Sequence, residues 1–478
     1  MKENEKSLLN RLLEYGVSGN YPFHMPGHKR RLWAGEWGNP IAMDITEIDG
    51  FDNLHAPEGI LKESMEMASA YYGSDKTYYL VNGSTCGILS AVCACTSLEG
   101  TVLMARNCHK SAYHGVYLNR LKVGYLYPQW MEGFGMDGGY LLETVVREVE
   151  KHPDAQAVLL VSPTYEGVVS DIRQIAEYLH GRGIPLIVDE AHGAHFPFGV
   201  QGYFPKSALD EGADVVIQSL HKTLPSPTQT AVLHVKSRLV DRERLERYLH
   251  IYQSSSPSYL LLAGIDRCVR GMIGEGRGLM DGYVKRLAEF RQWAAGLSRI
   301  RLLGPEEIGS NGVFDMDKSK LMLSVQNTDW SGRQLMDVLR DEYHLELEMS
   351  APTYALAMTT VADSEEGFLR LKEALSQLDG RLCAKTRDLS FCQKKIRLQQ
   401  ERTIAEALDE RKGRVRWEDC SGRIAAETIY VYPPGIPIMV PGERITKEAV
   451  EAVAAYKSLG YPVLGMADES GKTVACLE

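Results

Sequence analysis

The 478-residue sequence has no excess of positive charge, no long hydrophobic run and no regular cysteine pattern. With 53 basic and 63 acidic side chains its net charge is −10, which argues against binding to nucleic acid or to an anionic membrane. No apolar run is long enough to span a bilayer, and the charged N-terminus lacks the apolar core of a signal peptide. The nine cysteines are odd in number and scattered, which is typical of a reducing compartment. We therefore expect a cytoplasmic protein.

The sequence also lacks a phosphate-binding loop and a metal-ligand pattern. Asp189-Glu-Ala-His192 spells a helicase-like Walker-B box, but that interpretation requires Gly-x-x-x-x-Gly-Lys-Ser/Thr upstream. The only Gly-Lys-Thr begins at Gly471, near the C-terminus, and Gly465 before it is one place out of register. The histidines near these motifs show no tight ligand pair followed by a second pair at zinc-site spacing. We expect no metal site.

Short apolar runs alternate with amphipathic helical patterns from about residue 57. The pattern predicts helices over 59–72, 86–98, 140–151 and 172–182, and strands over 101–105, 157–161, 185–188 and 215–218. Such alternation is typical of βαβ units. We therefore expect an α/β fold with a mostly parallel central sheet and helices on both faces.

The chain is too long for one ordinary core, so several domains are expected. A short helix over 7–14 opens the N-terminal arm, a helical stretch over 258–297 is broken at 271–278, and a charged helix is predicted over 393–411. The expected parts are an irregular N-terminal arm (1–56), a large domain (57–300), a smaller α+β domain (301–385) and a C-terminal domain (386–478).

Asp189 and Lys222 each follow a short apolar run that is predicted to be a buried parallel strand. Ligands of an open α/β sheet collect outside the carboxyl ends of its strands, so both side chains should face one crevice. Either residue alone is more often a helix cap or a solvated charge. Together they resemble what pyridoxal phosphate (PLP) requires, because a lysine forms a Schiff base with its aldehyde and a carboxylate keeps its pyridine nitrogen protonated.

A second cluster of polar residues suits a phosphate. Asn82-Gly-Ser-Thr85 precedes a predicted helix, so backbone N–H groups and the hydroxyls of Ser84 and Thr85 lie at a helix N-terminus. Serine and threonine are also ordinary N-cap residues, which leaves a purely structural interpretation open. Ser219 and His221 come just before the predicted Schiff-base lysine and add donors near the same point. The combination predicts a phosphate site beside that lysine.

Read together, these motifs resemble the ornithine/lysine/arginine decarboxylase family, which belongs to fold type I of the PLP-dependent enzymes, the aspartate-aminotransferase-like superfamily. The length resembles compact members that lack an N-terminal wing domain. The resemblance implies a type I PLP-dependent transferase fold. The matching segments follow one another along nearly the whole chain: Met25-Pro-Gly-His-Lys29, Asp52-Asn-Leu-His-Ala-Pro-Glu-Gly59, Asn82-Gly-Ser-Thr85, Arg106-Asn-Cys-His-Lys-Ser111, Ser162-Pro-Thr-Tyr165, Val188-Asp-Glu-Ala-His192, Ser219-Leu-His-Lys-Thr223, Thr228-Gln229, Ser255-Ser-Pro-Ser-Tyr259, Tyr432-Pro-Pro-Gly-Ile-Pro437 and Pro441-Gly-Glu443.

The resemblance implies a role for each matching position. Lys222 is expected to hold PLP covalently, Asp189 to pair with the pyridine nitrogen and His109 to stack on the ring face. Ala191 is expected to pack under the ring, and His192 to reach its phenolic oxygen. A helix-capping or core role is the alternative for His109. The expected phosphate ligands are Ser84, Thr85, Ser219, His221 and, from a neighbouring subunit, Ser255.

The resemblance further implies decarboxylation of a basic amino acid, with arginine slightly ahead of lysine and ornithine. Lys222 or His109 would return a proton to Cα after the loss of CO2. Glu443 is expected to bind the cationic side chain, since a carboxylate pairs with a guanidinium through two hydrogen bonds. A carboxylate that favours the start of the next helix is the alternative for Glu443. Because active sites of this fold usually lie at a dimer interface, we expect a homodimer or higher homo-oligomer without nucleic-acid or membrane partners.

Some positions depart from the family pattern. Arg30 and Arg31 replace a glycine and place two cations near the expected entrance to the site. Leu220 replaces a small polar residue, and Glu166 stands where tyrosine or aspartate is more familiar. None of these changes touches the core PLP set, but all bear on the substrate.

Two rival functions share parts of the pattern. An aminotransferase of the same fold would bind the substrate carboxylate with an arginine from a strand of the small domain, yet the strand-like stretch 354–361 contains no arginine. A non-catalytic regulatory paralogue would have no need of both Lys222 and Asp189. These observations favour a decarboxylase.

Overall fold

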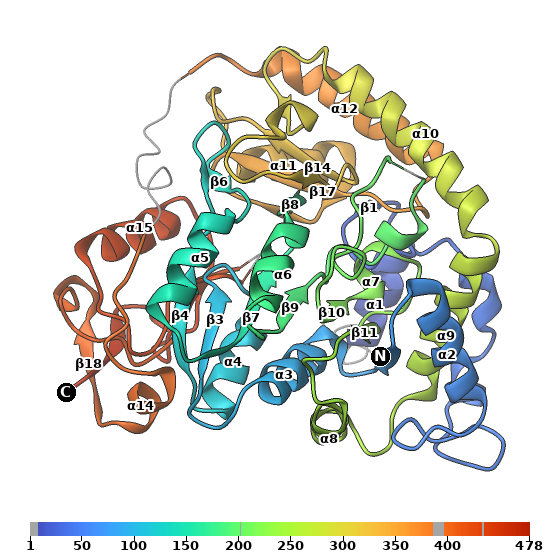
Figure 1. Cartoon of the computed structure of the whole chain (residues 1–478). Helices are drawn as coiled ribbons and strands as arrows, with labels where there is room; N and C mark the ends of the chain where they lie inside the picture. Colours follow the sequence, from blue (N-terminus) through green and yellow to red (C-terminus); the bar gives the residue numbers. More distant parts are fainter. Residues whose placement is uncertain (1–7, 201, 386–395, 433–434) are drawn as a thin grey trace.

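The computed structural model describes residues 8–200, 202–385, 396–432 and 435–478 (Figure 1). Its centre is a seven-stranded sheet, in which β11 runs antiparallel to both of its neighbours and all other adjacent pairs are parallel. The expected mostly parallel sheet is therefore confirmed. From edge to edge the strands are β2 (Lys76–Leu80), β11 (Ala231–Val235), β10 (Val215–Gln218), β9 (Leu186–Asp189), β7 (Ala155–Val161), β3 (Thr101–Ala105) and β4 (Lys122–Leu126).

The order of the strands explains why helices cover both faces of the sheet. The chain crosses the sheet in one direction from β2 through β3 to β4, and returns through β7, β9 and β10. Because crossovers between parallel strands are right-handed, this reversal moves the connecting helices to the opposite face. The helices before the reversal are α3 (Gly83–Cys95) and α4 (Lys110–Leu118), and those after it are α5 (Leu142–Lys151) and α6 (Ile172–His180) (Figure 1).

Burial accounts for the strands that the sequence predicts well. Every residue of β3, β9 and β10 is buried, as short continuous apolar runs require. Strands β2, β4 and β11 were missed, because lysine, tyrosine, glycine or histidine interrupts their apolar residues. Helix α3 begins at Gly83, three residues before its predicted start at Cys86, so Ser84 and Thr85 lie in its first turn.

Long helices flank the sheet on one side. The predicted helical stretch 258–297 forms two helices, α9 (Tyr259–Gly274) and α10 (Gly276–Ala294), and the break between them is narrower than predicted. Helices α2 (Ile60–Tyr72) and α8 (Arg242–Tyr252) complete this part, and α8 packs on α3.

A smaller α+β part follows α10. Its antiparallel sheet has the order β12 (Arg301–Leu302), β14 (Lys320–Ser324), β17 (Tyr354–Met358) and β16 (Met349–Ser350). Helix α11 (Gly332–Tyr343) packs on β16 and β17, and α12 (Glu365–Arg381) packs on α10 and α11 (Figure 1).

The N-terminal arm is more regular than expected. It contains α1 (Leu8–Gly16) and β1 (Tyr21–Phe23), and β1 pairs in parallel with β15 (Leu345–Leu347). The arm then reaches the turn that carries Lys222, where the Gly27 N–H donates to the His221 carbonyl at 2.6 Å. A Cβ at Gly27 would lie 2.6 Å from the carbonyl oxygen of Leu224, so only glycine fits this approach.

The C-terminal region has its own small core, which includes Trp417, Ile429 and Met439. Its elements are α14 (Ile404–Asp409), β18 (Lys412–Arg416), β19 (Ile429–Val431), β20 (Pro437–Met439), α15 (Lys447–Ser458), β21 (Val463–Leu464) and β22 (Thr473–Leu477). The predicted charged helix 393–411 is wrong for residues 396–403, which are not helical, whereas residues 393–395 lie outside the described ones. Thr403 and Glu406 form a capping box that starts the helix at Ile404 instead.

Candidate active site

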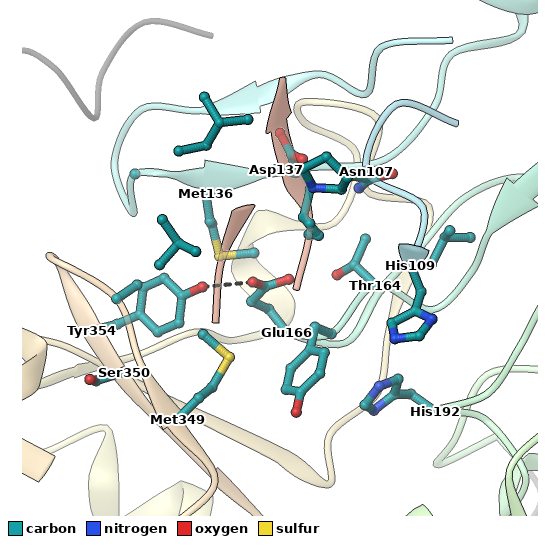
Figure 2. Close-up of a pocket in the computed structure, with 18 of the residues that line it drawn as sticks. Asn107, His109, Met136, Asp137, Thr164, Glu166, His192, Met349, Ser350 and Tyr354 are labelled. Atoms are coloured by element: carbon teal, nitrogen blue, oxygen red, sulfur yellow. Dashed lines mark hydrogen bonds between the residues drawn. The ribbon is translucent and has the colours of Figure 1, made fainter. Parts of the chain in front are cut away.

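A cavity of about 260 Å³ lies beyond the carboxyl ends of β9 and β10. Loops of the large sheet, the hairpin of β5 (Trp130–Met131) and β6 (Met136–Asp137), the small sheet and the C-terminal region all contribute to its walls (Figure 2). The parallel register sets Ile217 beside Asp189 and so brings that carboxylate to the turn after β10. Five predicted site residues line this one cavity: His109, Asp189, Ala191, His192 and Lys222.

The amine of Lys222 lies 2.9 Å from Nε2 of His192, and the amine of Lys320 lies 3.2 Å from Nδ1 of the same ring. A neutral imidazole has one donor nitrogen and one acceptor nitrogen, so the two contacts require one lysine to offer a lone pair. Burial lowers the pKa of Lys222, against the opposing effect of Asp189, and lowers the pKa of Lys320 to about 8. Burial, followed by repulsion from Lys222, keeps His192 neutral by lowering its pKa well below the usual value. A neutral lysine amine is the form that attacks an aldehyde.

Asp189 ends β9 with a buried carboxylate, whose Oδ1 accepts the Ala191 N–H at 3.1 Å. Burial raises the pKa of Asp189, and the nearby Lys222 lowers it in turn. A pyridinium placed in the cavity would act like Lys222 and favour the ionised carboxylate. Ala191 is 5% exposed and lines the cavity, so a flat ring has room there.

His109 caps a helix, as its alternative interpretation expects, while its stacking on the cofactor ring stays a prediction. It is the N-cap of α4, where its Nδ1 accepts the Ser111 N–H at 3.3 Å, and its ring also faces the cavity near His192 (Figure 2). Partial desolvation and then repulsion from Lys222 lower the pKa of His109 to about 4. The ring is therefore neutral near pH 7, with its proton on Nε2.

None of the four predicted phosphate ligands of this chain lines the cavity: Ser219 and His221 belong to the turn of Lys222, and Ser84 and Thr85 lie in the first turn of α3. A Cβ at Gly87 would lie 3.1 Å from Cγ2 of Ile217, so that glycine lets the start of α3 approach the end of β10. Ser219 is fully buried, and its hydroxyl has no hydrogen-bond partner among the described residues. The same is true of the Thr223 hydroxyl. Unsatisfied hydroxyls beside a helix N-terminus fit a phosphate, and with the cavity they fit PLP.

Ser255 is exposed on the loop that follows α8. Its neighbour Ser254 donates its backbone N–H to Asn82 at 3.5 Å, which places the loop near the start of α3 in the same chain. A contribution of Ser255 to the site of a second subunit stays a prediction.

Glu443 does not meet its expectation as a substrate ligand. Its carboxylate is fully buried and accepts two hydrogen bonds from Arg106, at 3.2 and 3.0 Å, and a third from the Val440 N–H at 2.8 Å. Arg106 also donates to the carbonyls of Pro437 and Ile438, which line the cavity. The predicted pairing of a carboxylate with a guanidinium is present, but it joins the end of β3 to the C-terminal region.

Two cations that were expected near the entrance have structural partners. Arg30 donates to the carbonyls of Tyr15 and Asn20, at 3.1 and 2.7 Å, and so holds the end of α1. Arg31 donates to the Ser364 hydroxyl at 3.4 Å.

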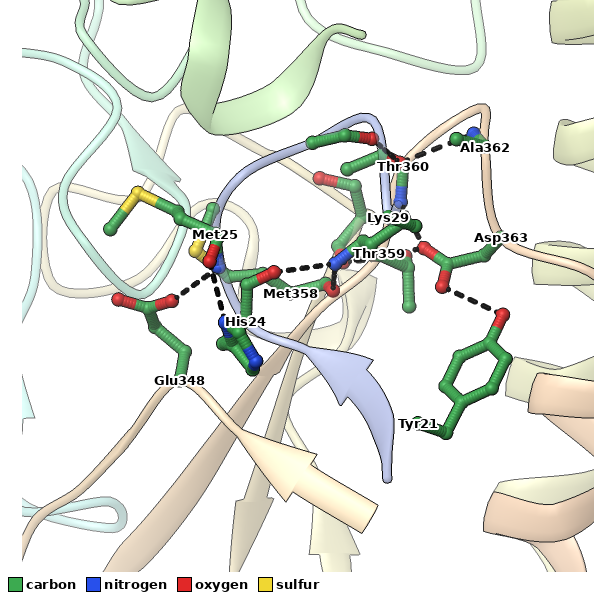
Figure 3. Close-up of polar contacts among 12 residues, drawn as sticks. Tyr21, His24, Met25, Lys29, Glu348, Met358, Thr359, Thr360, Ala362 and Asp363 are labelled. Atoms are coloured by element: carbon green, nitrogen blue, oxygen red, sulfur yellow. Dashed lines mark hydrogen bonds and ion pairs between the residues drawn. The ribbon is translucent and has the colours of Figure 1, made fainter. Parts of the chain in front are cut away.

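Glu348 links the N-terminal arm to the cavity wall, and sequence analysis missed it. Its two oxygens accept the Met25 N–H at 2.9 Å and the hydroxyl of Tyr165, a cavity residue, at 2.5 Å. Beside it, the fully enclosed Lys29 amine donates to the His24 and Met358 carbonyls (Figure 3). Lys29 was noted only as part of the Met25–Lys29 motif. Lys320 and Glu348 could not be singled out, because a charged residue at the edge of a short strand is usually solvated.

Comparison with known proteins identifies the family. Residues 7–332 match the family model described as Orn/Lys/Arg decarboxylase, major domain, and residues 384–459 match the C-terminal domain of the same family. The chain belongs to the Orn/Lys/Arg decarboxylases. The resemblance carried by the sequence motifs is confirmed, and with it the expected decarboxylase activity.

Relatives of this decarboxylase match it over nearly their full length. The arginine decarboxylase of Bacillus subtilis is 32% identical over 98% of this chain and 97% of its own. The uncharacterized protein YaaO of the same organism is 34% identical over 96% and 95%. Among solved structures, the lysine decarboxylase LdcF of Francisella novicida has a TM-score of 0.77 at 19% identity and covers 98% of this chain and 80% of that one. At that identity the match shows the fold alone.

Proposed function

We propose that this decarboxylase acts on arginine with PLP as its cofactor, and releases CO2 and agmatine. The observation that carries the proposal is the meeting of Asp189 and Lys222 in one cavity at the ends of two adjacent parallel strands. The full-length similarity to proteins named arginine decarboxylase supports the substrate.

The chain's own residues divide the work of holding the cofactor. Lys222 would hold its aldehyde carbon, Asp189 its pyridine nitrogen, and Ser219 with the first turn of α3 its phosphate. When bound, PLP supplies the electron sink that accepts the charge left by the departing CO2. Asp189 would favour a protonated ring nitrogen, and Ala191 and His109 would hold the ring between them.

Lys222 is assigned the return of the proton to Cα. His109 has a pKa of about 4 because of partial desolvation and repulsion from Lys222, so at pH 7 its ring is neutral and a weak acid. When free of the cofactor, the Lys222 nitrogen would carry the proton as an ammonium, give it to Cα and be left as a neutral amine. His109 keeps the role of covering the ring face.

Transamination is less well supported than decarboxylation. Strand β17 of the small sheet contains no arginine that could bind a substrate carboxylate. Arg340 pairs with Asp337 and Asp341 on α11, and Arg370 donates to the Tyr343 and His344 carbonyls. Both arginines are therefore used outside the cavity.

Location and assembly belong to the same proposal. No helix among the described residues has the length and apolar character needed to cross a membrane. We place the protein in the cytoplasm because its scattered cysteines suit a reducing compartment. We propose a homodimer, or a higher homo-oligomer, in which the exposed Ser255 of one chain approaches the phosphate site of its partner.

An amine-product assay tests the proposal. The PLP-loaded enzyme is incubated separately with arginine, lysine and ornithine, and CO2 and the amines are quantified. We expect agmatine to form with the highest kcat/KM. Lys222→Ala is the matched control and should release no CO2 while it remains folded. A higher kcat/KM for lysine or ornithine would contradict the substrate, and turnover by Lys222→Ala would contradict the site.

A further inference from the structure

Glu166 is a buried carboxylate in the wall of the active-site cavity that no step above uses. It follows Tyr165 on the loop after β7, is 7% exposed and lines the cavity. The Tyr354 hydroxyl donates to its Oε1 at 2.6 Å. Figure 2 shows this pair on the side of the cavity away from His109 and His192. One side of the cavity thus carries residues that are expected to bind the cofactor, and the other side carries the Glu166 carboxylate.

The charge around Glu166 is negative. No lysine or arginine forms an ion pair with it among the residues that the structure describes. Asp137, on β6, lines the same cavity. Burial, and to a lesser extent repulsion from Asp137, raises the pKa of Glu166, whereas the hydrogen bond from Tyr354 opposes this rise. A cation that entered here would relieve the cost of burying the Glu166 carboxylate.

The walls beside Glu166 are apolar. Met136 and Met349 flank the carboxylate, and Figure 2 shows both side chains next to the Glu166–Tyr354 pair. Thioether side chains adapt to a flexible chain of methylene groups. Apolar walls beside a carboxylate suit a substrate that has an aliphatic stem and a cationic tip.

We propose that Glu166 binds the distal cation of the substrate, held in place by Tyr354 and assisted by Asp137. The inference rests on the proposed function, and it adds the residue that distinguishes basic from neutral side chains. Tyr354 fixes one oxygen and the orientation of the carboxylate. The Thr164 hydroxyl and a backbone N–H also bond the Glu166 carboxylate, and its remaining acceptor capacity suits a planar guanidinium, which donates through two hydrogen bonds. Glu443 cannot bind the substrate cation, since its carboxylate is already paired with the guanidinium of Arg106.

The test compares two ligands that bind but are not decarboxylated. Agmatine carries the guanidinium, and its ureido analogue has the same length but no charge. Their dissociation constants are measured by calorimetry with the PLP-loaded enzyme. We expect wild type to prefer agmatine and Glu166→Gln to lose about tenfold to a hundredfold of that preference, the effect of one charge-assisted hydrogen bond. The visible absorbance of the bound cofactor should be the same in Glu166→Gln as in wild type.

Two further variants keep the test decisive if Glu166→Gln fails to fold. Tyr354→Phe keeps the carboxylate and should lower the preference for agmatine by less than Glu166→Gln. Asp137→Asn should also lower it. Glu177→Gln, on the exposed face of α6, is the matched control and should leave the preference unchanged.

The outcomes separate the two proposals. An enzyme that decarboxylates arginine, while its Glu166→Gln variant keeps the full preference for agmatine, would overturn the role of Glu166 and leave the function standing. A wild type with equal affinity for both ligands would also overturn that role. A wild type that releases no CO2 from any basic amino acid would overturn the proposed function itself.

Discussion

Lys320 is a buried lysine whose amine contacts the active-site histidine His192. It begins β14, is 2% exposed, and contacts the back of His192 with its amine. Gly167 has a positive φ of 101°, and a Cβ there would lie 2.8 Å from Cγ of Lys320. The glycine therefore makes room for the lysine stem. An amine held at this point fixes which nitrogen of His192 carries the proton, and hence what His192 offers to Lys222.

Lys320→Met should change the dependence of stability on pH. Burial lowers the folded-state pKa of Lys320 from 10.5 to about 8, so between these values the unfolded chain binds more protons than the folded one. The stability of the wild type therefore rises with pH across this window, by up to about 3 kcal/mol, and below pH 8 it bears the cost of the buried ammonium. The variant lacks this rise.

The measurement is the difference in unfolding midpoint between the two proteins at several values from pH 7 to 10.5. The difference should shift in favour of wild type as the pH increases. Lys372→Met, on the exposed side of α12, is the control and should follow wild type throughout. A constant difference for Lys320→Met would mean that Lys320 keeps an ordinary pKa.

At the residue scale the sequence predicted correctly that Lys222, Asp189 and His192 meet in one cavity, whereas it misjudged the surroundings of Glu443. Lys222, Asp189 and His192 sit in motifs whose spacing along neighbouring strands fixes their meeting point. Glu443 was misplaced, because a motif cannot tell whether a carboxylate faces a ligand or an arginine of the same chain. Glu166 was noticed only as a departure from a pattern, since its partner Tyr354 lies 188 residues away.

Between elements, the Arg106–Glu443 pair is the main polar link from β3 to the C-terminal region. The guanidinium bonds the Glu443 carboxylate, two carbonyls next to it in space, and the Tyr113 hydroxyl at 2.9 Å. Nε, Nη1 and Nη2 of Arg106 all donate hydrogen bonds at this interface. Because Pro437 and Ile438 line the cavity, the pair also places one wall of the active site.

Glu443→Gln should destabilise the protein rather than weaken substrate binding. Removal of one partner of a buried ion pair leaves the Arg106 charge uncompensated, at a cost of about 3–5 kcal/mol. The denaturant midpoint should fall clearly, while the KM for arginine should stay near the wild-type value. Glu401→Gln, which breaks a more exposed pair with Arg444, is the control and should lower the denaturant midpoint far less. A large rise in KM at unchanged stability would restore Glu443 as the substrate ligand.

The boundaries of helices and strands were predicted less well than the presence of these elements. The fully buried strands β3 and β10 were predicted to the residue, because burial on both faces of the sheet demands mostly apolar side chains. Helix α3 was predicted to start too late, since Gly83, Ser84 and Thr85 carry no apolar periodicity. The charged segment before α14 has helix-forming residues, but only Ile404–Asp409 forms a helix behind its capping box.

On the scale of the whole molecule, the proposed dimer should share its active sites. If Ser255 contacts the phosphate of the partner's cofactor, Ser255→Asp should weaken PLP binding in the partner's site by charge repulsion. Mixtures of inactive Lys222→Ala and Ser255→Asp chains should then recover about a quarter of wild-type activity, because half of the random dimers are mixed and each has one intact site. Each variant alone is the control. No recovery, or an active monomer in sedimentation, would contradict the shared site.

The architecture of the large domain was predictable from two general rules of α/β folds. Alternating strands and helices imply a parallel sheet, and right-handed crossovers then fix the side of each helix. The contacts of the N-terminal arm were not predictable, since β1 pairs with β15 more than 300 residues away and nothing in its proline-rich sequence marks that partner.

Lys222, in the cavity shared with Asp189, is the residue that we propose carries PLP. Lys320 is the alternative residue to carry PLP, because its amine contacts the other ring nitrogen of His192. The most direct test is to reduce the PLP-loaded enzyme with borohydride, digest it and locate the pyridoxyl group by peptide mass spectrometry. The account predicts the label on Lys222 alone, together with loss of the visible absorbance. A label on Lys320, or no covalent label at all, would contradict it.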